Sequence, residues 1–124
     1  MSTEAVTSVI QTYFDAFYEG DTEKLARAFH PSARLYSIDG ESVRELSREQ
    51  WFDAVRQRKS PKSAGLARTD RILSVDVHGA LASAKVELSM APKYFVDQLT
   101  LLNVPGRGFQ IVAKAFLTRI DESA

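Results

Sequence analysis

The sequence contains no cysteine and only two histidines among its 124 residues. Without cysteine the chain can form neither a disulfide nor a thiolate site, and a metal site would have to combine a histidine with carboxylates. We therefore expect no metal and no cofactor. A chain of this length can bury a core of useful size without such cross-links, so we expect a single domain over residues 1–124.

An excess of charge of either sign is also absent, because 16 Lys and Arg residues balance 16 Asp and Glu residues. A neutral chain offers no broad electric field to nucleic acid or to an anionic membrane. One local basic cluster consists of Arg56, Arg58, Lys59 and Lys62. Because Asp53 lies nearby and no aromatic residues interleave, we interpret this cluster as a solvated loop rather than a nucleic-acid surface.

Long apolar runs are missing as well. No stretch of about 20 apolar residues, the length that spans a bilayer, occurs in the chain. The N-terminus is polar and acidic, where a signal peptide would carry basic and then apolar residues. These features predict a cytoplasmic protein that makes no use of a membrane.

The first part of the chain carries a helical pattern from residue 2 or 3 onward. Its apolar residues recur at spacings of three and four: Val6, Val9, Ile10, Tyr13, Phe14 and Phe17. Gly20 lets this helix end in a left-handed residue, and Asp21 is placed to cap a second helix. The second helix is short, with Leu25 and Phe29 on its apolar side, and Pro31 prevents its continuation.

A third helix is predicted from a capping box, since Ser47 stands three residues before Gln50. Its buried face would carry Trp51, Phe52 and Val55.

The remaining segments alternate with a period of two, which is typical of strands. The predicted strands are Ala33–Asp39, a weaker Ser42–Leu46, Arg71–Val77, Leu81–Met90, Tyr94–Val104 and Phe109–Ile120. Turn residues separate the last four, which indicates antiparallel strands joined by hairpins. The last two strands are apolar on both faces, and one layer of helices covers only one face of a sheet. We therefore expect a second copy of the chain to cover the other face in a homodimer.

Three helices and a strongly bent antiparallel sheet, with Gly20-Asp21, Leu25 and Phe29–Ala33 at the joint, resemble the nuclear transport factor 2-like superfamily. Within it, the chain is most similar to the group labelled "putative lumazine-binding", relatives of ketosteroid isomerases and polyketide cyclases. The resemblance covers nearly the whole chain, including Leu46–Trp51, Asp97–Leu102 and Ile111–Lys114. It implies an α+β fold in which a cone-shaped curved antiparallel sheet wraps on three N-terminal helices and encloses a mostly apolar pocket. It does not define a reaction, because this architecture hosts isomerases, dehydratases, cyclases and proteins without catalytic activity.

Ketosteroid isomerases combine a base aspartate with an oxyanion hole made from a tyrosine and a protonated aspartate. The resemblance puts Tyr13 on the position of that tyrosine and Asp97 on that of the second aspartate, while Ser37 takes the position of the base. A serine hydroxyl has no useful basicity unless another group activates it. Asp39 would share a face with Ser37 in a regular strand and could replace it as the base. The alternative is that Asp39 is an ordinary turn residue before Gly40.

Each of these candidates also has a structural interpretation. Tyr13 fits a core tyrosine, Trp51 fits helix-to-sheet packing, and His30 fits the negative end of the second helix better than proton transfer. Apolar neighbours of Asp97 would keep its carboxyl group protonated, whereas a bond to Lys114 on the adjacent strand would keep it charged. We favour the protonated form, because the lysine side chain is flexible enough to reach solvent instead.

Two functional hypotheses follow. In the first, a homodimeric binding protein holds a small apolar or heteroaromatic ligand, and the residues around it are Tyr13, Phe17, Tyr36, Trp51, Phe95, Asp97 and Phe116. In the second, the protein is a cofactor-independent isomerase, dehydratase or cyclase, in which Tyr13 and Asp97 polarise a substrate carbonyl and Asp39 or His30 is the base. A carboxylate or imidazole other than Asp97 in the cavity of Tyr13 would favour the enzyme, and its absence would favour binding.

Overall fold

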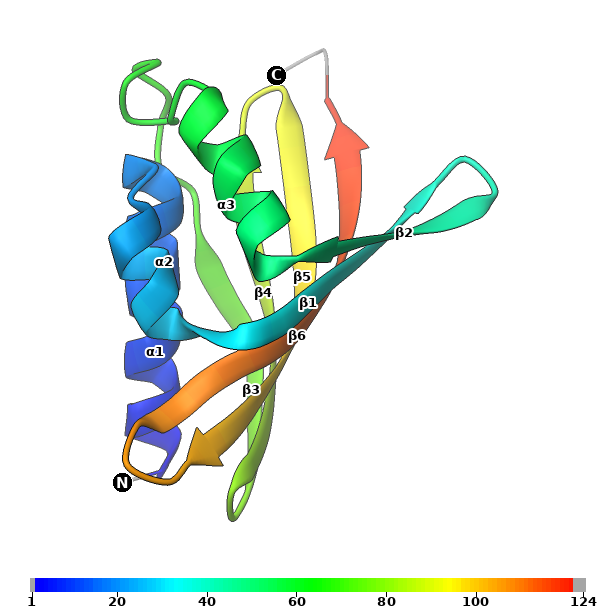
Figure 1. The fold of residues 1–124 in the computed structure, drawn as a ribbon. Helices are drawn as coiled ribbons and strands as arrows, with labels where there is room; N and C mark the ends of the chain where they lie inside the picture. Colours follow the sequence, from blue (N-terminus) through cyan, green and yellow to red (C-terminus); the bar gives the residue numbers. More distant parts are fainter. Residues whose placement is uncertain (1, 122–124) are drawn as a thin grey trace.

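The computed structural model of the chain describes residues 2–121. Its elements follow one another as α1 (Ser2–Glu19), α2 (Thr22–Ala28), β1 (Phe29–Asp39), β2 (Ser42–Ser47), α3 (Arg48–Gln57), β3 (Arg71–His78), β4 (Leu81–Met90), β5 (Lys93–Val104) and β6 (Gly108–Ile120). The six strands form one sheet in the order β2-β1-β6-β5-β4-β3 (Figure 1). The predicted elements are all present, and the fold is of the α+β class.

The corner between α1 and α2 forms as predicted. Gly20 has a φ of 69°, and a Cβ at this position would lie 2.8 Å from the Cβ of Ser60, so the close approach of the loop after α3 requires glycine here. Asp21 Oδ1 accepts hydrogen bonds of 3.0 and 3.2 Å from the backbone N–H groups of Glu23 and Lys24. The predicted cap of α2 is therefore confirmed.

The capping box of α3 is also confirmed. The Ser47 hydroxyl accepts from the Gln50 N–H at 3.1 Å, and the Gln50 side chain accepts from the Ser47 N–H at 2.8 Å.

The end of α2 differs from the prediction. The helix ends at Ala28, and Phe29 is the first residue of β1 rather than part of the apolar side of α2. Pro31 lies within β1, so it excludes the helix but not the strand. His30 Nδ1 lies 2.8 Å from Ser32 Oγ and accepts from the Ser32 N–H, so its ring contacts β1 instead of capping α2.

Antiparallel hairpins connect β3, β4, β5 and β6, as the sequence predicts. One pair departs from the expected antiparallel arrangement, because β1 and β6 pair in parallel, with Leu35 beside Lys114. A parallel pair needs a long crossover, and residues 40–107 supply it. The last strand thus lies in the middle of the sheet.

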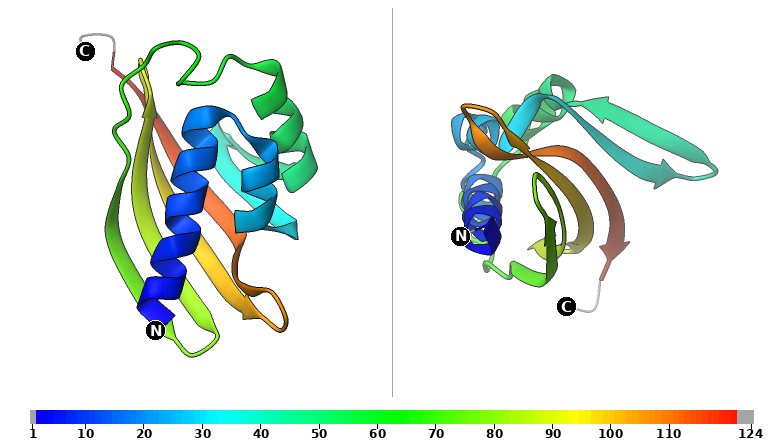
Figure 2. Two further views of the ribbon diagram at one scale, coloured as in Figure 1. Left: turned by 90° about the vertical axis from the view of Figure 1, so that its left-hand side faces the viewer. Right: turned by 90° about the horizontal axis from the view of Figure 1, so that it is seen from below.

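The sheet curls around the helices, which all lie on its concave side (Figure 2). From α1, Val6, Ile10 and Phe14 are buried in the core, and Leu99 and Leu101 of β5 face them from the sheet. Inward-facing residues alternate with outward-facing ones along each strand, so one face of the sheet forms the inner wall of a cone. The cone is open, because β2 and β3 do not pair with each other.

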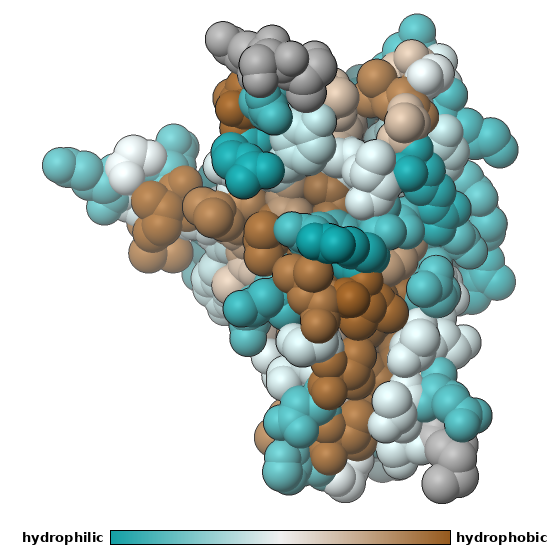
Figure 3. Space-filling view, turned by 180° about the vertical axis from the view of Figure 1, so that it is seen from behind, coloured by the Kyte–Doolittle hydropathy of each residue, from teal (hydrophilic) through white to brown (hydrophobic). Residues whose placement is uncertain are grey.

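The convex face of the sheet carries exposed apolar side chains. They are Tyr36, Ile38, Val43, Leu102 and Leu117, and Figure 3 shows apolar side chains gathered along this side of the molecule. None of the helices covers this face within residues 2–121. Of the described helices, none combines the length and apolar character needed to cross a membrane.

Candidate functional site

Tyr13 lies at the centre of the helix-to-sheet interface and is fully buried. Its position on α1 follows from the spacing of the apolar face, since Ile10, Tyr13 and Phe17 lie on one side of the helix. The Tyr13 ring meets Phe29 edge to face, with centroids 5.2 Å apart. An aromatic ring in such a setting is a normal core residue, so the chemistry of the site depends on what its hydroxyl group contacts.

The Tyr13 hydroxyl joins two buried charged side chains. It donates a hydrogen bond of 2.5 Å to Asp97 Oδ2 and accepts one of 2.8 Å from Lys114 Nζ. Lys114 Nζ also lies 3.6 Å from Asp97 Oδ2. Asp97 is fully buried and Lys114 is 5% exposed, so the expectation that the lysine reaches solvent is wrong.

Strand register explains how Asp97 and Lys114 meet. Lys114 on β6 pairs with Leu99 on β5, and Asp97 is the preceding inward-facing residue of β5. Diagonal neighbours on one face of an antiparallel pair are within reach of long side chains. The sequence left open whether Asp97 has only apolar neighbours or a bond to Lys114. In the structure, Lys114 lies beside the carboxyl group of Asp97.

Three aromatic rings surround the Lys114 ammonium group. Lys114 Nζ lies 4.3 Å from the ring centroid of Trp51, 5.0 Å from that of Phe116 and 5.1 Å from that of Tyr13. Aromatic faces attract a cation more strongly when water is excluded. These contacts offset part of the cost of burying the charge.

Burial shifts the pKa values of Tyr13 and Lys114 in this cluster. The pKa of Tyr13 is raised well above its usual value, mainly by burial and further by the charge of Asp97 and the hydrogen bond to it. The pKa of Lys114 is lowered, because burial and the positive charge of Arg58 outweigh the attraction of Asp97. Tyr13 is therefore a neutral hydrogen-bonding group at physiological pH, and its proton lies on the bond to Asp97.

A cavity of about 190 Å³ opens next to this cluster, between α3 and the inner faces of β5 and β6. Its lining residues are Tyr13, Phe17, Arg44, Leu46, Trp51, Ala54, Arg58, Met90, Lys93, Phe95, Lys114, Phe116 and Thr118. Five of them are aromatic residues that the sequence indicates as ligand contacts: Tyr13, Phe17, Trp51, Phe95 and Phe116. The arrangement can hold a flat ring and offer it hydrogen-bond donors.

The other candidates from the sequence lie elsewhere. Asp97 is behind Tyr13 and does not line the cavity, and its Oδ1 atom has no hydrogen-bond partner among residues 2–121. Tyr36 follows the inward-facing Leu35, so the period of two turns it to the convex face. Asp39 is exposed near the tip of the β1–β2 hairpin, and His30 binds Ser32 outside the cavity. The structure therefore brings Tyr13, Asp97 and Lys114 together but neither Asp39 nor His30.

Sequence reasoning named Lys114 but missed the other basic residues of the cavity, Arg44, Arg58 and Lys93. The cluster that it assigned to a solvated loop includes Arg58, which is half-buried against the Phe17 ring at 5.4 Å. The missed signal was helical spacing, because residues three and four apart share a helix face and Trp51, Ala54 and Arg58 follow that rule. Arg44 is missed for a similar reason, since it alternates in β2 with the inward-facing Leu46.

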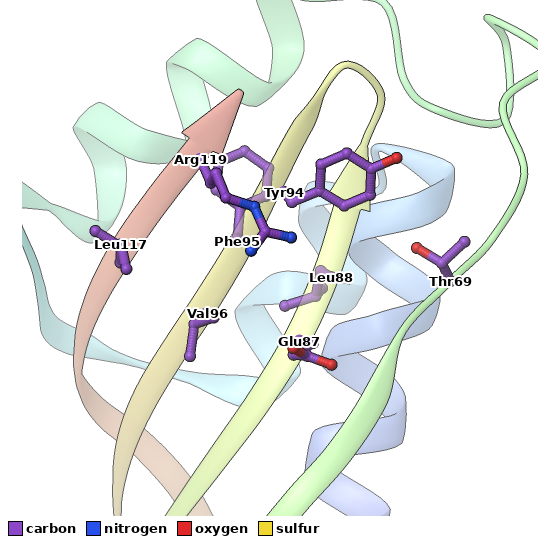
Figure 4. Close-up of a pocket in the computed structure, with 8 residues that line it drawn as sticks. All are labelled: Thr69, Glu87, Leu88, Tyr94, Phe95, Val96, Leu117 and Arg119. Atoms are coloured by element: carbon purple, nitrogen blue, oxygen red, sulfur yellow. The ribbon is translucent and has the colours of Figure 1, made fainter. Parts of the chain in front are cut away.

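A second concavity, of about 270 Å³, lies at the convex face near the ends of β4, β5 and β6. Its residues are Thr69, Glu87, Leu88, Tyr94, Phe95, Val96, Leu117 and Arg119, drawn in Figure 4. The Arg119 guanidinium lies 5.8 Å from the Tyr94 ring centroid, and Glu87 is engaged by Arg71 at 2.6 Å. Because its charged groups already pair with neighbours and its floor includes the exposed Leu117, we assign it to the apolar face rather than to the site.

No group of three or more His, Asp or Glu side chains within residues 2–121 is arranged to hold a metal ion.

The curved sheet with its inner cavity defines the class of protein, a nuclear transport factor 2-like cone. The chain belongs to the family described as "Putative lumazine-binding", whose model matches residues 1–117. No curated protein matches the chain.

Solved structures of the same fold support this assignment. A nuclear transport factor 2-like protein of unknown function from Silicibacter pomeroyi is 26% identical, with 94% of this chain and 95% of that chain covered and a TM-score of 0.78. Another from Methylobacillus flagellatus is 25% identical over 94% and 91% of the two chains, with a TM-score of 0.82. One from Shewanella baltica, 21% identical over 94% and 93%, reaches a TM-score of 0.84 and shows the shared fold.

Proposed function

We propose that this protein binds a small apolar or heteroaromatic molecule, of the size and flatness of lumazine, in the inner cavity. The observation that carries the proposal is the combination of aromatic walls with hydrogen-bond donors at the inner end. The rings of Trp51, Phe95 and Phe116 offer stacking surfaces, and Lys114 and Arg58 are donors. Ligand sites in small domains have this composition, mostly apolar with a few polar groups that fix orientation. The family description points to the same kind of ligand.

The size of the cavity limits the ligand. A cavity of about 150 Å³ accommodates benzene, so one of about 190 Å³ suits one substituted ring or two small fused rings. A bicyclic pteridine fits this limit, and larger cofactors such as flavins would have to extend through the mouth.

A catalytic role is the second candidate, and the hydrogen bond between Tyr13 and Asp97 is the observation that favours it. A tyrosine paired with an aspartate polarises a carbonyl when the tyrosine proton is directed at the substrate. Here that proton lies on the bond to Asp97, and Lys114 occupies the hydroxyl from the other side. Among the described residues that line the cavity, none is a carboxylate or an imidazole. These features make binding the better-supported function.

Titration with lumazine tests the binding function. Trp51 is the only tryptophan of the chain and lies in the cavity wall, so its fluorescence reports occupancy directly. We expect saturable quenching together with a rise in melting temperature, because a ligand that binds only the folded state stabilises it.

A variant that fills the cavity provides the specificity control. Ala54→Phe adds a ring to the cavity lining from α3, and we expect it to abolish the saturable quenching. Ala5→Phe introduces the same ring at an exposed position of α1 and should leave quenching unchanged. If Ala54→Phe binds lumazine as well as the wild-type protein does, the ligand is not in this cavity and the proposal is wrong.

A further inference from the structure

The charges around the inner cavity are all of one sign. Arg44, Arg58, Lys93 and Lys114 line it, and no Asp or Glu is among the described lining residues. The chain as a whole is neutral, with 16 basic and 16 acidic residues, so this is a local accumulation. Like charges gathered around one concavity raise the local potential and attract ions of the opposite sign.

Only one of the four basic residues is neutralised. Lys114 lies beside Asp97, whereas Arg44, Arg58 and Lys93 form no ion pair with any residue between 2 and 121. Arg44 and Lys93 are exposed at the mouth, where water solvates them. Arg58 is half-buried, and its Nη2 atom is buried without a hydrogen-bond partner. A buried donor on a charged group that lacks a partner is costly. Because Arg58 lines the cavity, an anion bound there would offset part of the cost of burying this charge.

We propose that the natural ligand is a small aromatic carboxylate, with its ring between the aromatic walls and its carboxylate on Arg58. This inference rests on the proposed binding function and narrows its ligand class. The planar guanidinium group matches a carboxylate with two parallel hydrogen bonds. The Phe17 ring, 5.4 Å from the guanidinium carbon, holds the group in place. Arg44 and Lys93 at the mouth would speed capture of the anion from solution.

Matched pairs of acids and neutral amides test the charge requirement. We would titrate the protein with benzoate and benzamide, and with 2-naphthoate and 2-naphthamide, using Trp51 fluorescence and calorimetry. The members of each pair have nearly the same shape, so a difference in affinity reports the charge. We expect each acid to bind at least about 10-fold more tightly than its amide, the factor that a hydrogen bond to a charged group contributes.

One variant inside the cavity and one outside it identify the residue that binds the carboxylate. Arg58→Gln should weaken binding of the acids by about 10- to 100-fold and that of the amides by less than about 3-fold. Arg56→Gln removes the same charge two residues earlier, where Arg56 pairs with Asp53 outside the cavity, and should change neither affinity. If Arg58→Gln does not fold, the ratio of acid to amide affinity of the wild-type protein still decides whether the site prefers a carboxylate.

The possible failures separate the two proposals. If acid and amide bind equally, or if lumazine binds and neither acid does, the carboxylate inference is wrong and the binding function stands. If none of these compounds binds, lumazine included, both proposals are wrong. If the acids are preferred but Arg58→Gln keeps the preference, Arg58 is not the residue that binds the carboxylate, and the inference fails as stated.

Discussion

The hydroxyl of Tyr13 donates a hydrogen bond of 2.5 Å to Asp97, although 84 residues separate the two in the chain. Lys114 completes the group by donating to the same hydroxyl at 2.8 Å. All three side chains are buried, so removing any one takes a hydrogen bond or a counter-charge from the other two. We expect their effects on stability to be strongly coupled, as is normal for residues in one hydrogen-bond network.

Asp97→Asn should destabilise the protein at pH 7. Because the substitution leaves the buried Lys114 ammonium without its counter-charge, we expect a loss of roughly 3 kcal/mol or more in the free energy of unfolding. Urea denaturation of wild type and variant measures it, with the exposed Asp76→Asn as the control. The double variant Asp97→Asn/Lys114→Met should recover a large part of the loss. Unchanged stability in Asp97→Asn would instead indicate the protonated aspartate that the family resemblance implies.

Tyr13→Phe should change the pH dependence of stability at high pH. The pKa of Tyr13 is raised in the folded state, so the folded protein keeps a proton that the unfolded chain loses near pH 10. The stability due to this group is thus fully present below pH 10 and is lost as the pH rises above it. Unfolding free energies of the two proteins, measured between pH 8 and about 11, should therefore converge from pH 10 upward. Parallel curves would show that Tyr13 ionises equally in both states.

The protein should be a homodimer that covers the apolar convex face. Light scattering at micromolar concentration should give twice the chain mass of 13.8 kDa. Leu117→Glu, at a position 67% exposed on this face, should shift the mass toward the monomer. Leu73→Glu, on the edge strand β3, is the matched control and should leave it unchanged. A wild-type protein that stays monomeric would contradict the prediction.

The protein should show no ketosteroid isomerase activity. The resemblance to ketosteroid isomerases puts Ser37, which is no base, at the position of the base, and Asp39 does not line the inner cavity. A four-ring steroid also needs a pocket of roughly 300 Å³ or more, which exceeds the volume of about 190 Å³ next to Tyr13. Loss of the base alone costs about 100- to 10,000-fold in rate. Turnover of a 5-ene-3-keto steroid well above the buffer rate would contradict this, and Asp39→Asn would then be the first variant to test.

Local sequence patterns predict the fold well where a residue's role depends only on its near neighbours in the chain. Gly20 and Asp21 define the corner between the helices, and Ser47 with Gln50 defines the start of α3, because caps and left-handed residues depend only on near neighbours. The parallel pairing of β1 with β6 was not predicted, since it joins residues about 80 apart and no periodicity carries that information.

For the site, local patterns likewise predict which residues face the interior but not how their side chains pack. Alternation in β5 and β6 puts Asp97 and Lys114 on the inner face, and helical spacing adds Tyr13 and Trp51. Whether Lys114 stays buried or extends into water depends on the side chains packed around it, and these come from distant parts of the chain. Burial by three aromatic rings keeps Lys114 inside, although an isolated lysine of this length would extend into water.

The central place of β6 in the sheet has a consequence for how the protein is made. Neither β1 nor β5 has its full set of partners until Gly108–Ile120 has left the ribosome, and Lys114 arrives with that strand. Residues 29–39 must therefore keep an unpaired edge until residues 40–107 and the strand that follows them have been synthesised. Such long-range pairing slows folding and leaves the nascent chain open to aggregation. The sheet of this domain can therefore be completed only once β6 has been synthesised.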